Sequence, residues 1–183
     1  MKISDLVTND WNAIEQAARL LVAGFKTHWP NAWPDIKAAL DEVNECLKPG
    51  KINRIAVDDK CTVLGWIGGL SEYNGNAWEL HPLVVHPDYQ GQGIGRALVS
   101  DFEQQVKSRG GLTIYLGTDD EDNMTTLSGT NLYPNILEYI ANIKNLREHP
   151  YEFYQKVGFT LVGVIPDANG LGKPDIIMAK RVG

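Results

Sequence analysis

Cysteine is scarce in this sequence, which has only Cys46 and Cys61 among its 183 residues. Their separation matches no metal-binding pattern, and two cysteines do not make the disulfide framework of a small secreted domain. The composition therefore favours two reduced thiols in a protein of a reducing compartment.

An excess of basic residues is also missing. The chain has 17 Lys and Arg against 23 Asp and Glu, which gives a formal net charge of -6. Nucleic-acid binding depends on clustered Lys and Arg that neutralise phosphates, so this charge argues against a nucleic-acid partner. It is compatible with a cationic substrate.

Long apolar runs are absent as well. No stretch approaches the roughly 18 apolar residues that a membrane-spanning helix needs, and residues 1–5 lack the apolar run of a signal peptide. We therefore expect no membrane partner and a cytoplasmic location. No internal repeat or low-complexity linker interrupts the chain, and its length predicts a single domain over residues 1–183.

Periodicity predicts both helices and strands. Helical spacing is clear over residues 11–25, with Asp10 as N-cap, and over 94–109. Helices are also expected over 35–47, over 134–146 with residues 136, 137, 140 and 143 inward, and over 151–157. Strands are expected over 54–57, 62–70, 77–85, 112–116, 159–165 and 175–180. Pro82 cannot donate to a ladder, so its strand should carry a bulge or break. This order predicts an α/β (α+β) fold with a mixed sheet covered by helices.

The most informative stretch runs from an apolar strand through a glycine-rich turn into an apolar-faced helix. The first N–H groups of a helix have no internal acceptors, and glycines let the main chain approach an anion closely. A dinucleotide fingerprint would need glycine or alanine where Arg96 stands, and a P-loop would need Lys-Ser/Thr where Arg96-Ala97 stand. The candidate binding residues are Leu83, Val84, Val85, Gln90, Gly91, Gln92, Gly93, Ile94, Gly95 and Arg96.

Two motifs in this sequence resemble those of the GCN5-related N-acetyltransferase (GNAT) superfamily. Gln90-x-x-Gly93-x-Gly95 is similar to its pyrophosphate-binding motif, and the segment 152–159, Glu-Phe-Tyr-Gln-Lys-Val-Gly-Phe, is similar to its closing helix and strand. The resemblance implies acetyl-CoA as co-substrate, without a metal. It also implies a GNAT-like sheet splayed open between the strand before the loop and the strand after the following helix.

Further stretches narrow the resemblance. Residues 78–85, 114–120 and 145–154, together with 168–170 and 173–176, resemble the enterococcal-type branch of aminoglycoside 6'-N-acetyltransferases. That branch has a less glycine-rich phosphate loop, so CoA binding should carry over while the substrate range need not. The resemblance implies acetylation of the 6'-amino group of aminoglycosides, a link to antibiotic resistance, and a homodimer.

Acetyl transfer to an amine needs a base, a polarised thioester and a proton for the leaving thiolate. Glu79 is the candidate base, acting through a water with His81 two residues on along the strand; the alternative is that Glu79 only binds the cation. Backbone N–H groups near Leu83 to Val85 are candidate oxyanion donors. By resemblance, Tyr154 is the general acid for the thiolate; the alternative is that its hydroxyl only contacts the sulfur and its ring packs.

Acidic residues suggest how a polycation would be bound. The loop that begins at Asp119 and includes Asp122 should border the acceptor side of the cleft, and Glu72 with Glu79 would extend the negative surface. A charge run is usually only a solvated loop, and it is the resemblance that favours substrate attraction here. Trp29 and Trp33 either cover the acceptor or belong to the core.

Three other functions remain open. A polyamine, a peptide or a protein N-terminus is an alternative acceptor within the superfamily. A non-catalytic CoA-binding sensor and a purely structural domain belong to other classes. The amine that gives turnover with acetyl-CoA distinguishes these possibilities.

Overall fold

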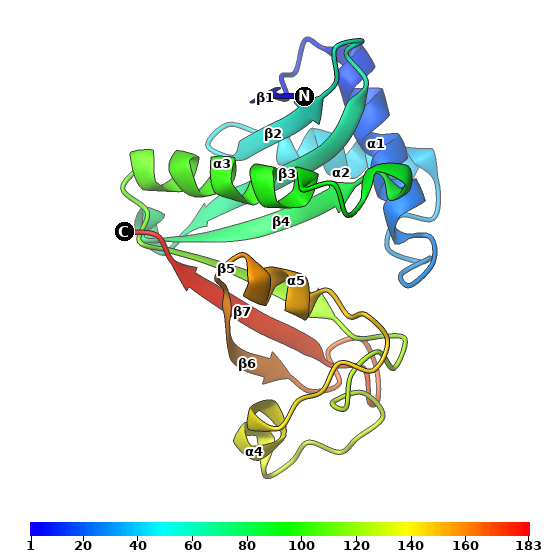
Figure 1. The fold of residues 1–183 in the computed structure, drawn as a ribbon, viewed down its shortest axis with the longest axis vertical. Helices are drawn as coiled ribbons and strands as arrows, with labels where there is room; N and C mark the ends of the chain where they lie inside the picture. Colours follow the sequence, from blue (N-terminus) through cyan, green and yellow to red (C-terminus); the bar gives the residue numbers. More distant parts are fainter. The chain divides into compact units, whose positions relative to one another are not determined.

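The structure, a computed structural model, describes residues 1–183 and divides them into two compact units (Figure 1). The first unit comprises residues 1–114 with 182–183, and the second comprises residues 115–181. The first contains β1 (Lys2–Asp5), α1 (Trp11–Phe25), α2 (Ile36–Cys46), β2 (Ile52–Val57), β3 (Val63–Glu72), η1 (Tyr73–Gly75), β4 (Ala77–Val85), η2 (Pro87–Tyr89) and α3 (Ile94–Ser108). β5 (Thr113–Asp119) leads into the second, which contains α4 (Ile136–Ala141), α5 (Tyr151–Lys156), β6 (Thr160–Ile165) and β7 (Asp175–Arg181).

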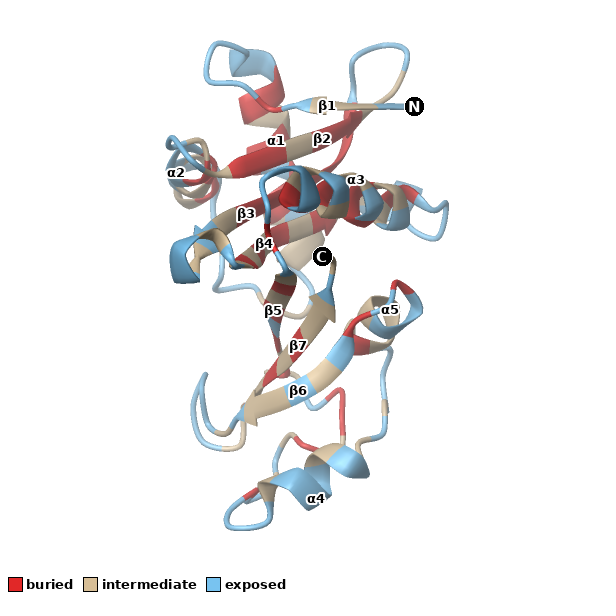
Figure 2. Ribbon diagram, turned by 90° about the vertical axis from the view of Figure 1, so that its left-hand side faces the viewer, coloured by how far each residue is buried: buried red, intermediate tan, exposed pale blue.

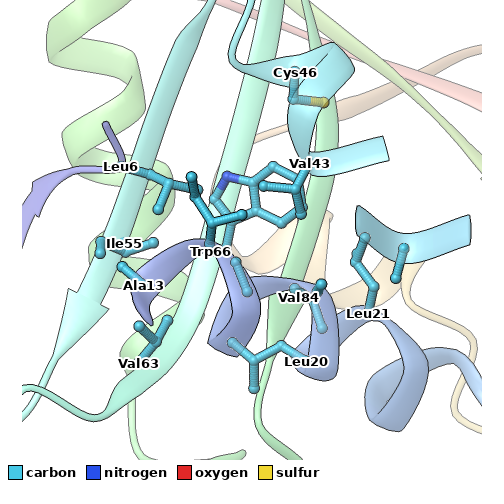
Figure 3. Close-up of a cluster of buried hydrophobic side chains, with 14 residues drawn as sticks. Leu6, Ala13, Leu20, Leu21, Val43, Cys46, Ile55, Val63, Trp66 and Val84 are labelled. Atoms are coloured by element: carbon cyan, nitrogen blue, oxygen red, sulfur yellow. The ribbon is translucent and has the colours of Figure 1, made fainter. Parts of the chain in front are cut away.

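In the first unit, four antiparallel strands lie in the order β1-β2-β3-β4 and have helices on both faces. Residues of α1 and α2 pack around the fully buried Trp66 of β3 (Figure 3). On the opposite face, a Cβ added at Gly69 would lie 2.3 Å from the Phe102 ring, so this glycine allows α3 to approach closely. The predicted α/β fold is confirmed.

Helices α1 and α2 each begin after an aspartate that caps the helix, as predicted for Asp10. Asp10 accepts a hydrogen bond from Ala13 N at 3.0 Å, and Asp35 accepts one from Ala38 N at 2.9 Å. Each carboxylate satisfies a backbone donor that the helix leaves without an acceptor. The prediction for residues 11–25 is confirmed as made, and that for 35–47 is confirmed to within one residue at each end.

The irregularity predicted at Pro82 is present in β4. Gly69 pairs with Leu80 and Ile67 pairs with Leu83, so Gly68 alone lies opposite the two residues His81 and Pro82. The peptide bond between those two residues is cis. The extra residue makes a bulge, which separates the stretch that carries Glu79 from the stretch that leads into the glycine-rich turn.

In the second unit the strands lie in the order β5-β7-β6, with β6 at the edge. β6 and β7 pair antiparallel from Thr160 with Ala179 to Ile165 with Asp175. α5 packs on β7 and α4 on β6. Gly158 follows α5 with φ of +95°, the conformation expected of a glycine after a helix.

The helix predicted over residues 134–146 is wrong in length and orientation. Only Ile136–Ala141 is helical, and most of this short helix is exposed (Figure 2). Leu137, expected to face inward, is 81% exposed. The segment after it is drawn into another set of bonds: Lys144 N donates to Thr126 Oγ1 and Leu146 N donates to Met124 O. Backbone pairing with a distant loop thus overrides the local helical pattern.

The strand β1 was not predicted. It pairs with β2 from Lys2 opposite Val57 to Asp5 opposite Arg54, although its four residues carry no alternation that predicts a strand.

No helix of the structure combines the length and the apolar character needed to cross a bilayer.

Candidate active site

The glycine-rich turn lies between the end of β4 and the start of α3, as the sequence predicts. After Val85 the chain passes through η2, whose N-cap His86 accepts a hydrogen bond from Asp88 N at 3.2 Å. Gln90 Nε2 donates back to Val85 O at 3.3 Å. These local bonds fold the turn so that Gly91, with φ of +75°, leads into the helix.

The N-terminus of α3 has the features of an anion site. Gly93 is its N-cap, with φ of +84°, and no side chain accepts a hydrogen bond there. The first turn contains no acidic residue, and nothing lies within 4 Å of a Cβ built on Gly91 or on Gly93. Open space, a helix dipole and outward N–H groups fit a pyrophosphate. The candidate residues Gln92, Ile94, Gly95 and Arg96 belong to this same turn and first helical turn.

Glu79 and His81 lie on one face of β4. Leu80 lies between them and pairs with Gly69, and α3 covers this face of the sheet. Because side chains alternate along a strand, Glu79 and His81 point to the opposite face, which α1 and α2 cover. Both are half-buried. Glu79 is opposite Leu70, and Glu72 lies two residues further along β3 on the same face. Diagonal neighbours of this kind are about 7–8 Å apart, so the three predicted residues form a row.

Sequence reasoning missed one residue of this face, Glu42 of α2. Its Oε1 lies 3.4 Å from His81 Nε2. Trp33 lies beside the same imidazole, with ring centroids 6.1 Å apart. Trp33 also packs edge-on against Phe25 at 4.6 Å and is half-buried against the core. Trp33 therefore packs on the core and also lies beside the predicted catalytic histidine. That it covers the acceptor stays a prediction.

The predicted oxyanion donors lie just after the bulge. Leu83, Val84 and Val85 face Ile67, Trp66 and Gly65 of β3, and His86 N donates to Leu64 O at 2.9 Å. These pairs and this hydrogen bond hold the start of the glycine-rich turn against β3. The use of these backbone groups for an oxyanion stays a prediction.

Tyr154 belongs to α5 in the second unit. Its ring packs edge-on against Phe153 and Phe159, with centroids 5.2 and 5.7 Å apart, and the residue is half-buried. Burial raises the pKa of the Tyr154 phenol well above its ordinary value of 10. The hydroxyl therefore keeps its proton throughout the neutral range, as a proton donor must.

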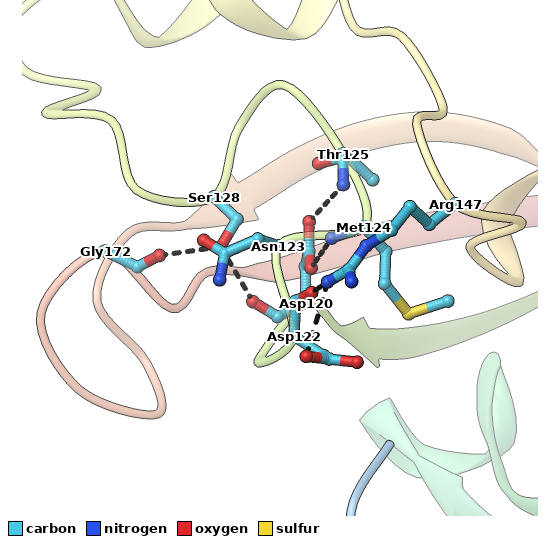
Figure 4. Close-up of polar contacts among 8 residues, drawn as sticks. All are labelled: Asp120, Asp122, Asn123, Met124, Thr125, Ser128, Arg147 and Gly172. Atoms are coloured by element: carbon cyan, nitrogen blue, oxygen red, sulfur yellow. Dashed lines mark hydrogen bonds and ion pairs between the residues drawn. The ribbon is translucent and has the colours of Figure 1, made fainter. Parts of the chain in front are cut away.

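The acidic loop after β5 is more structured than a solvated charge run (Figure 4). Asp120 is fully buried, and its carboxylate accepts from Met124 N and Thr125 N at 2.7 Å each. Arg147 lies 3.3 Å from the carboxylate of Asp122 and donates to its carbonyl. The carboxylate of Asp119 accepts a hydrogen bond from Asn169. The two predicted substrate-binding residues of this loop thus already have protein partners.

His149 has an architectural place in the second unit. Its buried ring accepts from Tyr151 N at Nδ1, which leaves Nε2 to donate to the carbonyl of Asp119 at 3.1 Å. Both ring nitrogens are therefore engaged by the backbone. Nowhere does the structure bring together three His, Cys, Asp or Glu side chains that could hold a metal ion.

Comparison with known proteins identifies the family of this chain. A model of the acetyltransferase (GNAT) family matches residues 14–128, which include β4, the turn and α3. An aminoglycoside 6'-N-acetyltransferase solved as a complex with coenzyme A is 45% identical, with a TM-score of 0.92, over 100% of this chain and 98% of that one. The aminoglycoside 6'-N-acetyltransferase of Enterococcus faecium is 44% identical over the same shares, with a TM-score of 0.88.

Among curated relatives, the uncharacterized N-acetyltransferase ycf52 of Gracilaria tenuistipitata var. liui is 28% identical over 102 residues, which cover 48% of this chain and 54% of the relative. The chain spans about half the length of the curated relatives it matches. The family match, in contrast, covers more than half of this chain and contains the uncapped helix N-terminus and the strand that precedes it. On that basis, the chain is a member of the GNAT acetyltransferase family.

Proposed function

We propose that this protein transfers the acetyl group of acetyl-CoA to an amine of a small polycation, and that the amine is the 6'-amino group of an aminoglycoside. The observation that carries the proposal is the uncapped N-terminus of α3, which the glycine-rich turn joins to the strand that bears Glu79 and His81. Likeness over the whole chain to two aminoglycoside 6'-N-acetyltransferases supports the choice of acceptor. In this proposal the two units act together as one acetyltransferase domain.

The cofactor's pyrophosphate would be held by residues 90–96, where the helix supplies N–H groups and the glycines supply space. In the reaction the amine nitrogen bonds to the thioester carbonyl carbon, and the C–S bond then breaks. Backbone N–H groups of Leu83 to Val85 would stabilise the oxyanion in between. The amine must lose one proton and the departing thiolate must gain one.

Glu79 and His81 would take the first of these protons through a water. The carboxylate of Glu79, with Glu72 beside it, would also attract the cationic acceptor. Tyr154 would supply the second proton from its phenol, which is protonated at neutral pH, although burial raises its pKa and so makes it a weaker acid than an exposed tyrosine. Asp119 and Asp122 would contribute through the negative potential of their loop, since their side chains already bind protein groups.

The test is CoA release, followed with a thiol reagent, with four acceptors: kanamycin, an aminoglycoside with a hydroxyl in place of the 6'-amine, spermidine and a short peptide. Turnover with kanamycin but not with the hydroxyl analogue is expected. Preference for spermidine or the peptide would refute the aminoglycoside proposal and keep the family's chemistry. CoA binding without turnover on any amine would indicate a non-catalytic sensor.

Glu79→Gln separates the two roles of this carboxylate. Loss of a base lowers kcat, whereas loss of charge attraction alone raises KM. Glu103→Gln is the control, because Glu103 belongs to α3 on the other face of the sheet and forms no part of the proposed site.

We also propose that the protein is a homodimer that associates through the second unit. Much of α4 and of the edge strand β6 is exposed (Figure 2), and large apolar side chains on and around these elements are among the exposed residues. An edge strand with such side chains and without lysine or proline is suited to cover by a second copy. Sedimentation of wild type and Leu137→Lys tests this, with a dimer and a monomer expected, respectively. The apolar residues are Tyr133, Leu137, Tyr139, Leu146, Val162, Ile165 and Leu171.

The proposed reaction fixes the setting in which the protein works. Acetyl-CoA is an intracellular metabolite, so we propose a cytoplasmic location and a role in antibiotic resistance. Expression in a susceptible bacterium should raise the inhibitory concentration of kanamycin but not that of the hydroxyl analogue. Equal inhibitory concentrations with and without the protein would contradict this role.

A further inference from the structure

One carboxylate of the first unit is joined to the predicted catalytic histidine although it lies on a different element. Glu42 of α2 places Oε1 3.4 Å from Nε2 of His81 on β4. The glutamate side chain is only 26% exposed. Partial burial of a carboxylate is unfavourable in free energy unless charged or hydrogen-bonding partners compensate for the lost hydration.

The same carboxylate is held in place from its own helix. Cys46, one turn further along α2, directs its Sγ to Oε1 of Glu42 at 3.3 Å. Burial, with the nearby Glu42 charge, raises the pKa of the Cys46 thiol to about 12, so the sulfur keeps its proton and remains a donor. Because Cys46 itself is buried in the core, this contact fixes the carboxylate against α2.

The imidazole is confined on a second side by Trp33, whose ring is tilted 43° to it. The pKa of Glu42 is held below its ordinary value of 4.5, chiefly by the hydrogen bond from His81, with smaller effects of Cys46 and Trp33, against the opposing effect of burial. Glu42 is therefore a carboxylate at neutral pH. An acceptor next to Nε2 selects the imidazole tautomer that carries its proton there.

We propose that Glu42 is a positioning residue for acetyl transfer: it holds Nε2–H of His81, so that Nδ1 is the nitrogen that exchanges a proton with the acceptor amine or its relay water. The inference rests on the proposed function, in which His81 serves the acceptor. A base oriented by a carboxylate on a separate element is a general arrangement of proton-transfer sites. Nothing in the linear sequence brings these two residues together, because one is on a helix and the other on a strand.

Two substitutions separate positioning from charge. Glu42→Gln removes the charge but keeps an amide oxygen that accepts from Nε2–H, whereas Glu42→Leu removes the acceptor. Glu45→Gln is the matched control: it removes one negative charge from the same helix, at an exposed residue that pairs with Lys48 and Lys51.

The first measurement is the tautomer of His81 by ¹⁵N NMR of the free protein, which requires no turnover. Wild type and Glu42→Gln should show the Nε2–H form, Glu42→Leu should lose that preference, and the control should match wild type. An unchanged tautomer in folded Glu42→Leu, or an Nδ1–H form in wild type, would overturn the proposal. Because this readout is independent of activity, it stands even when no amine is acetylated.

The second measurement is the division of the effect between kcat and KM with the best acceptor. Positioning predicts that Glu42→Leu lowers kcat by up to about a hundredfold, while Glu42→Gln stays within a few-fold of wild type. Equal rises in KM for both variants, with kcat unchanged, would make Glu42 a binding charge and overturn the proposal. If Glu42→Leu does not fold, a loss of kcat in Glu42→Gln as large as that of His81→Ala also overturns it.

Discussion

Replacing Gly93 by alanine separates two demands on one residue, the backbone conformation and the space above it. Gly93 has φ of +84°, in the left-handed region that side chains disfavour. Nothing lies within 4 Å of the added Cβ, so no contact in the free protein is disturbed. The left-handed conformation costs an alanine about 1–2 kcal/mol. Alanine also lowers the conformational entropy of the unfolded chain, which offsets part of this cost and leaves a net loss of stability of about 1 kcal/mol.

The effect on CoA should be larger. The added methyl group would stand where the main chain of the α3 N-terminus has to approach a phosphate. Weakening one or two hydrogen bonds to a charged group costs about 2–3 kcal/mol, which corresponds to a rise in Kd on the order of a hundredfold.

Gly50→Ala is a matched control for this prediction. Gly50 has φ of +91°, also has nothing within 4 Å of an added Cβ, and lies in the turn between α2 and β2. Both variants should lose about 1 kcal/mol in urea unfolding, while only Gly93→Ala should lose CoA affinity in calorimetric titration. CoA binding by Gly93→Ala within threefold of Gly50→Ala would refute the assignment of the phosphate site.

Three further predictions concern single side chains. Tyr154→Phe should slow acetyl transfer by about 10²–10⁴-fold if the phenol is the general acid. Because the pKa of this phenol is raised, its ionisation should not reduce the wild-type rate as the pH rises to 10. A rate of Tyr154→Phe within twofold of wild type would show that the ring only packs. Arg54→Met should lower the unfolding free energy by about 1.5–3 kcal/mol, because it leaves the partly buried Asp101 without the two hydrogen bonds it accepts at 2.6 and 3.1 Å; unchanged denaturant midpoints would contradict this. Asp120→Asn should cost about 1–3 kcal/mol, because its amide nitrogen cannot accept from the backbone of the loop, and urea unfolding without a shift would show that the second hydrogen bond is dispensable.

Acidification offers a test of Glu42 in the folded state. Its pKa is lowered by folding, so the stability it contributes is fully present above about 4.5 and is lost as pH falls through the lower folded value. The unfolding free energy of wild type should therefore drop on acidification more steeply than that of Glu42→Gln. Parallel pH curves for the two proteins would contradict the stabilising hydrogen bond between His81 and Glu42.

Local sequence signals predicted the parts of the fold that local chemistry determines. The capping carboxylate of Asp10 located the start of α1, and Pro82 located the bulge in β4. The same reasoning failed where a distant segment decides the conformation. Residues 144–146 continue a helical pattern, yet they pair with the backbone of residues 124–126 instead.

The candidate site divides in a similar way. The anion-binding turn could be read from the order of strand, glycines and helix, and Glu79 with His81 from the period of a strand. Glu42 could not, because its contact with His81 depends on how α2 packs over the sheet. In the acidic loop, the sequence alone does not distinguish Asp120 from its charged neighbours. Asp120 is fully buried and its neighbours are not, because residues 120–128 fold around its carboxylate.

The most direct test of the central claim is to identify the product. Purified protein, acetyl-CoA and kanamycin would be incubated together, and the aminoglycoside would be examined by mass spectrometry and two-dimensional NMR. The account predicts a single added acetyl group on the 6'-nitrogen. Acetylation of any other amine would contradict the proposed regiochemistry, and unmodified kanamycin in the presence of bound acetyl-CoA would contradict the aminoglycoside acetyltransferase function itself.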